Sequence, residues 1–143
     1  MGRRLPFMVT RILIADDDSS IRRLLRRLIE EHAGWEVCGE AENGLDAVVK
    51  TDQLAPDLVV LDLAMPHMNG LQAGRTIAKT SPLLPMLLLT VQEVSSELVD
   101  EARDAGFRGA VSKSTGSEVV AGVETLLERR LFFRSTPGDL SPA

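Results

Sequence analysis

One short apolar run that ends at a single carboxylate constrains this chain more than any other feature. The run spans residues 58–61, and Asp62 follows it directly, before a loop that contains Pro66 and Gly70. Four consecutive apolar residues suit a strand that is buried on both faces of a parallel sheet. Asp62 is therefore expected at the carboxyl end of a central strand, where open α/β sheets bind their ligands.

Apolar runs and amphipathic segments alternate along the rest of the chain. Strands are predicted at residues 10–15, 35–40, 58–61, 86–89 and 108–112, and helices at 21–29, 43–55, 69–79, 94–105 and 115–127. Right-handed crossovers place the helices on both faces of such a sheet. The alternation predicts a doubly wound five-stranded parallel α/β sheet of order 2-1-3-4-5, a flavodoxin-like (βα)5 fold.

Helical spacing also predicts which side chains of the helices face the core. In the first helix these are Ile21, Leu24, Leu25, Leu28 and Ile29, and in the second they are Leu45, Val48 and Val49. The arginines at positions 22, 23, 26 and 27 fall largely outside the first stripe. They form either a solvated face, partly paired with Glu30 and Glu31, or a docking surface for an acidic or helical partner.

Length and composition predict one domain. The chain has 143 residues, and we expect a flexible leader at 1–9, the domain at 10–128 and a frayed C-terminal tail at 129–143 without a DNA-binding domain. No apolar run approaches the roughly 18 residues of a membrane span. The lone Cys38 favours a reducing cytoplasm, and a net charge of −5 argues against direct nucleic-acid binding.

Polar side chains follow the predicted strands at their carboxyl ends. They are Asp16 and Asp17 after the first strand, Asp62 after the third, Thr90 after the fourth and Lys113 after the fifth. In the predicted strand order they converge on one crevice. Neighbouring carboxylates 4 Å apart repel by about 4 kcal/mol at an effective dielectric near 20, so a compensating cation is expected. Lys113 and an oxygen-liganded ion, above all Mg²⁺, would supply that charge.

This set of groups favours phosphoryl transfer. A carboxylate attacks phosphorus to form an acyl phosphate, while a metal ion and a lysine neutralise the equatorial oxygens. Asp62 is the predicted nucleophile because it stands alone at the centre of the sheet, and Asp16 and Asp17 are better placed to hold the metal. Thr90 can donate to a phosphoryl oxygen.

Four segments carry a resemblance to a known family. They are residues 14–17 (Ile-Ala-Asp-Asp), 62–70 (Asp-Leu-Ala-Met-Pro-His-Met-Asn-Gly), 89–90 (Leu-Thr) and 112–114 (Ser-Lys-Ser). With them the chain resembles the response regulator receiver domain of two-component signalling, of the chemotaxis type, over about residues 10–128.

The resemblance implies roles for particular residues. Asp62 would take a phosphoryl group from a histidine kinase or phosphotransfer protein, and Thr90 and Lys113 would contact the phosphoryl oxygens. Asp17, Asp62 and the backbone carbonyl of Ala64 would bind Mg²⁺, with Asp16 acting mainly through a metal-bound water. Such a chain is no enzyme beyond its own phosphorylation and dephosphorylation. Its output protein is unknown, and a homodimer is one form of assembly.

The chain departs from the family at Ala110, where receivers commonly carry Tyr or Phe. A methyl group cannot fill or vacate an aromatic pocket, so the usual two-position switch is in question. Phe107 is a candidate substitute. In the tail, the cluster at residues 131–133 could fold back onto the last helix or bind a partner.

Three other interpretations compete. A degenerate receiver that serves only as a docking module is compatible with Ala110. A Mg²⁺-dependent aspartyl-phosphate phosphatase would need a second acid two residues after its nucleophile, where this chain has Ala64. A flavodoxin-like nucleotide binder would need a phosphate loop rich in Gly, Ser and Thr after the first strand, where three aspartates stand instead.

Overall fold

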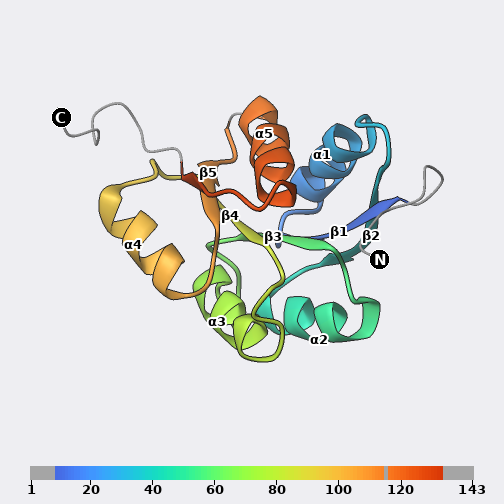
Figure 1. Ribbon diagram of the computed structural model, residues 1–143. Coiled ribbons are helices and arrows are strands. Elements are labelled where there is room, and N and C mark those ends of the chain that lie inside the picture. The colour runs from blue at the N-terminus through green and yellow to red at the C-terminus, as the bar shows by residue number, and fades with distance from the viewer. Residues whose placement is uncertain (1–8, 115, 134–143) are drawn as a thin grey trace, which may run out of the picture.

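A computed structural model describes residues 9–114 and 116–133 as five helices packed around one sheet (Figure 1). The strands are β1 (Thr10–Ala15), β2 (Trp35–Ala41), β3 (Leu58–Asp62), β4 (Met86–Thr90), β5 (Gly109–Ser112) and β6 (Phe132–Phe133). The helices are α1 (Ser19–Glu30), α2 (Gly44–Leu54), α3 (Gly70–Thr80), α4 (Ser96–Asp104) and α5 (Gly116–Leu127). Thr115, the predicted start of a capping box for the last helix, lies outside the described residues.

The sheet is parallel throughout and has the order β2-β1-β3-β4-β5-β6. This confirms the predicted fold class and the order 2-1-3-4-5. The chain direction across the sheet reverses at β1, which pairs with β2 on one side and β3 on the other. The carboxyl ends of β1 and β3 therefore lie side by side at the topological switch point.

The sixth strand was not predicted from the sequence. Phe132 and Phe133 pair with Gly109 and Ala110 of β5, so a segment expected to be frayed continues the sheet in parallel. In Figure 1 it is the short red arrow beside β5. The strand forms because Phe132 buries its ring, with 8% of the residue exposed, and its amide donates to the carbonyl of Arg108 at 2.8 Å.

Two hydrophobic cores lie on opposite faces of the sheet. Helices α1 and α5 cover one face, and α2, α3 and α4 cover the other (Figure 1). Every residue of β3 and β4 is buried, as a strand covered on both faces requires. Among the described helices, none is long and apolar enough to span a bilayer.

Two of the predicted helix faces were wrong in part. Leu24 of α1 is 40% exposed, and Leu45 and Val49 of α2 are each 51% exposed. Helix α2 instead buries Gly44, Ala47 and Thr51. A side chain on Gly44 would collide with the backbone of Met68. Because α2 lies so close to that loop, only small residues fit on its inner face and the larger ones point to solvent.

Candidate functional site

The loop after β1 delivers two aspartates to the carboxyl edge of the sheet. Asp16 is fully buried, and its amide donates to the carbonyl of Ala41 at 3.0 Å. Its Oδ1 accepts from the amide of Asp18 at 2.9 Å. Asp18 in turn caps helix α1 by accepting from the amides of Ser20 and Ile21. The neighbouring Asp17 is exposed.

Asp62 ends β3 with only 3% of its surface exposed. The loop that follows turns back to the end of the strand, where the amide of Gly70 donates to the carbonyl of Leu63 at 2.9 Å. A side chain on Gly70 would collide with the backbone carbonyl of Asp62, so this turn needs glycine. Asn69 and Gln72 form the predicted capping box at the start of α3.

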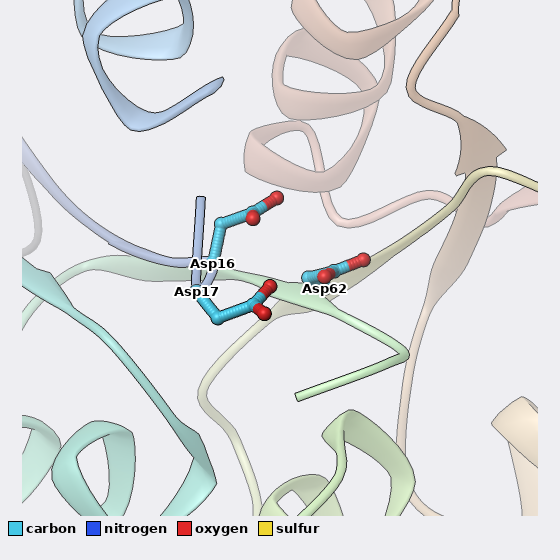
Figure 2. Close-up of side chains that lie close together, drawn as sticks. All are labelled: Asp16, Asp17 and Asp62. Carbon is cyan, nitrogen blue, oxygen red and sulfur yellow. The ribbon is translucent and has the colours of Figure 1, made fainter. Parts of the chain in front are cut away.

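The three acids Asp16, Asp17 and Asp62 meet as predicted. One carboxylate oxygen from each lies within 4.8 Å of the other two. Figure 2 shows the three carboxylates reaching the same side of the strand ends. Oxygen donors in this number and spacing fit a hard divalent cation such as Mg²⁺, which binds few carboxylates and keeps several waters. No Cys or His joins this group of ligands in the described part of the chain.

Lys113 closes the site from the end of β5. Its Nζ donates to Asp16 Oδ2 at 2.8 Å and lies 3.3 Å from Asp62 Oδ1. Thr90 is 1% exposed, its backbone carbonyl accepts from the amide of Lys113, and its hydroxyl accepts from the amide of Gln92 at 3.0 Å. Thr90 ends β4 and Lys113 directly follows β5, so both lie at the carboxyl ends of neighbouring strands.

Burial and like charge perturb the central carboxylate. Removal from water, followed by the charge of Asp16, raises the pKa of Asp62 to about 6, although Lys113 opposes the shift. Burial alone would lower the pKa of Lys113, but its hydrogen bond to Asp16 and the charge of Asp62 outweigh burial and raise it. The ammonium therefore stays charged at neutral pH.

The alanine at the aromatic position of β5 is buried, and Phe107 does not simply replace it. Ala110 is fully buried beside Leu88 and Phe133 in the neighbouring strands. Phe107 is 3% exposed, and a side chain on Gly74 of α3 would collide with its ring. The ring is thus packed tightly against α3, which argues against Phe107 as a mobile substitute.

One further residue, Arg22, reaches the site without being predicted from the sequence. Arg22 was assigned to the outer face of α1, but its Nη1 donates to the backbone carbonyl of Asp16 at 2.7 Å. A contact to a backbone atom leaves no signal in side-chain spacing. The distribution of charge gives one indication that an arginine contacts the acidic loop, because a helix with four arginines follows three consecutive aspartates.

A doubly wound parallel sheet with an acidic switch-point site, a lysine and a hydroxyl defines a class of phosphoryl-accepting signalling domains. The family model of the response regulator receiver domain matches residues 12–123. The chain belongs to this family, which confirms the predicted resemblance and the receiver function in two-component signalling.

Three known proteins show the range of the similarity. The chemotaxis protein CheY of Thermotoga maritima is 39% identical over 106 residues, which cover 74% of this chain and 87% of that protein. A two-component response regulator of the LuxR family from Aurantimonas has a crystal structure with a TM-score of 0.83, 33% identity and coverage of 87% of this chain and 89% of its own.

The third is the protein-glutamate methylesterase/protein-glutamine glutaminase of Pyrococcus abyssi, 34% identical over 75% of this chain. The chain spans only 29% of the length of that relative. The similarity therefore concerns the receiver unit.

Proposed function

We propose that this chain is a phosphoacceptor switch and that Asp62 receives the phosphoryl group from a histidine kinase or phosphotransfer protein. The observation that carries the proposal is the convergence of three carboxylates with the Lys113 ammonium, which lies within 3.3 Å of Asp16 and Asp62. The proposed ligands of Mg²⁺ are Asp17, Asp62 and the backbone carbonyl of Ala64, with Asp16 acting through a water.

The chain's own residues account for the transfer step. An Asp62 oxygen forms a bond to phosphorus as the bond from phosphorus to the donor histidine nitrogen breaks, and the histidine nitrogen takes back its electron pair. Bound Mg²⁺ would neutralise charge on the phosphoryl oxygens. Lys113 already stands beside the nucleophile, where its ammonium could contact those oxygens. The Thr90 hydroxyl accepts from the amide of Gln92 and can donate its own hydrogen to one of them at the same time.

The change of charge on phosphorylation of Asp62 would drive the conformational change of the switch. The phosphoryl group carries roughly −1.5 to −2 charges, which replace the single charge of the Asp62 carboxylate beside Lys113 and Thr90, and its oxygens are new acceptors that can reorganise the loops that follow β4 and β5. We place this activity in a receiver unit over residues 10–128 in the cytoplasm, with its own phosphorylation and dephosphorylation as its chemistry. The proposed partners beyond the kinase are an output protein and a second copy of this chain in a homodimer.

Intact mass measurement tests the proposal. Protein incubated with Mg²⁺ and a small acyl phosphate should gain one phosphoryl adduct, and Asp62→Asn should gain none because it lacks the nucleophile. Asp52→Asn is a matched control, since Asp52 is an exposed acid of α2 away from the site. An unmodified wild-type protein would instead support the docking-module interpretation, and steady phosphate release from added phosphomonoesters would support a phosphatase.

A further inference from the structure

A cluster of charged side chains joins α1 to β2 directly beside the acidic site. Arg22 links this cluster to the site. Its Nη1 donates to the backbone carbonyl of Asp16 at 2.7 Å, and its Nε donates to Glu40 Oε1 at 2.8 Å. Only 13% of the Arg22 side chain is exposed, so the guanidinium is held largely out of water.

Glu40 fixes the guanidinium of Arg22 from the end of β2. Its second oxygen accepts from Arg26 Nε at 2.8 Å, and its backbone carbonyl accepts from Lys50 of α2. Burial raises the pKa of Glu40, but the hydrogen bonds from Arg26 and Arg22 outweigh it and lower the pKa below its ordinary value. Glu40 is therefore ionised at neutral pH and holds Arg22 by a charged hydrogen bond.

Asp17 directly follows the carbonyl that Arg22 contacts. Its carboxylate is exposed, and within residues 9–114 and 116–133 no hydrogen bond to that carboxylate is found. Its direction is therefore set by the backbone on either side. The amide of Asp16 is bound to Ala41, the carbonyl of Asp16 to Arg22, and the amide of Asp18 to Asp16 Oδ1.

We infer that Arg22 is a positioning residue for Mg²⁺, because it anchors the peptide that joins Asp16 to Asp17 and so aims the Asp17 carboxylate at Asp62. The inference rests on the proposed function, in which Asp17 and Asp62 bind the ion. Groups that orient metal ligands in this way typically contribute 10- to 100-fold to metal affinity.

Positioning and plain electrostatics predict opposite results for loss of Arg22. The guanidinium is a positive charge bonded to the backbone of Asp16 beside the site, so its removal would strengthen Mg²⁺ binding if charge alone mattered. If Arg22 acts by anchoring the loop, its removal weakens Mg²⁺ binding although the site becomes more negative. The sign of the change therefore separates the two roles.

Titration of the full chain with Mg²⁺ alone, followed by backbone amide NMR, tests the inference. Arg22→Met should weaken Mg²⁺ binding about tenfold. It should also speed hydrogen exchange in metal-free protein at the amides of Asp16 and Asp18, which donate to Ala41 and to Asp16 Oδ1, and this readout does not involve bound metal. Arg22→Lys keeps the charge without the fork that reaches both partners, so it should weaken binding by a smaller factor.

Arg26→Met is the matched control. Arg26 makes the same 2.8 Å contact to Glu40, but it bonds Glu30 rather than the Asp16 carbonyl, so its loss should weaken Mg²⁺ binding far less than the loss of Arg22. Equal or tighter binding in Arg22→Met would overturn the inference. If that variant does not fold, wild-type affinity in Arg22→Lys would overturn it. Absence of Mg²⁺ binding by the wild type would instead refute the proposed function.

Discussion

At the scale of single residues, the central feature of the site is the buried carboxylate of Asp62, whose negative charge is unfavourable there. Asp62 is 3% exposed and shares Lys113 with Asp16, so one ammonium balances two buried carboxylates. The pKa of Asp62 rises to about 6 because burial and the charge of Asp16 outweigh the effect of Lys113. Such a carboxylate is costly to hold in the metal-free protein, and a cation or a phosphoryl transfer partner relieves that cost.

In metal-free protein at pH 7, Asp62→Asn should raise the free energy of unfolding by about 1–3 kcal/mol. Between about pH 4 and the pKa of about 6, the folded state binds the Asp62 proton more tightly than the unfolded chain does. Protonation of Asp62 therefore stabilises the folded state. This contribution to the free energy of unfolding is fully present below about pH 4 and is lost as the pH rises through about 6.

Urea unfolding with a chelator at about pH 4 and pH 7 measures this prediction. The advantage of the Asn variant should be largest at the higher pH and should disappear at the lower one. A variant that is less stable than wild type at pH 7 would show that Asp62 is stabilised, rather than strained, in the free site.

At the scale of elements, the edge of the sheet is completed by a strand from the C-terminal segment. Phe132 packs against Gly122 of α5, and Phe133 lies beside Ala110 with its ring 5.6 Å from the guanidinium carbon of Arg103 in α4. Strand β6 therefore contacts both helices that flank β5. It covers an edge that would otherwise expose unpaired backbone groups.

Phe132→Ala should lower the free energy of unfolding by about 2–3 kcal/mol, below the 3–5 kcal/mol of a central core Phe, because an edge strand can detach. Phe133→Ala should cost less, since Phe133 is only half-buried. Denaturant unfolding of both variants gives the comparison. Phosphorylation of Asp62 should persist in each, and equal stability of Phe132→Ala and wild type would mean that β6 is detached in solution.

At the scale of the whole molecule, residues from four strand ends make one site only because the sheet order reverses at β1. The acids come from β1 and β3, Thr90 from β4 and Lys113 from the end of β5. The unfolded chain has no such arrangement. A cation that needs several of these groups at once therefore binds the folded state selectively, and binding is linked to global stability.

Mg²⁺ should therefore raise the melting temperature. At a free concentration of 100 times its dissociation constant, the added stability is about 2.7 kcal/mol. Thermal unfolding with and without Mg²⁺ measures the shift. Asp17→Asn should reduce it strongly, while the exposed-acid variant Asp52→Asn should keep it. A wild-type melting temperature that does not respond to Mg²⁺ would contradict the assignment of the metal site.

Local sequence patterns determined the parts of this protein that depend on neighbours along the chain. The buried strands at 58–61 and 86–89, the capping box of Asn69 and Gln72, and the polar residue after each strand follow from hydrophobic periodicity and turn chemistry. Known strand-order rules then sufficed to bring Asp16, Asp62 and Lys113 together.

The tertiary structure alone decided the features that depend on distant packing. The outward turn of Leu45 and Val49 follows from the close approach of Gly44 to the backbone of Met68, which no helical period records. Strand β6 depends on the surface that β5 and α5 offer to Phe132. The bond from Arg22 to the Asp16 carbonyl depends on Glu40 of β2. Sequence encodes local preference directly, whereas such contacts arise only when segments far apart in the chain compete for the same space.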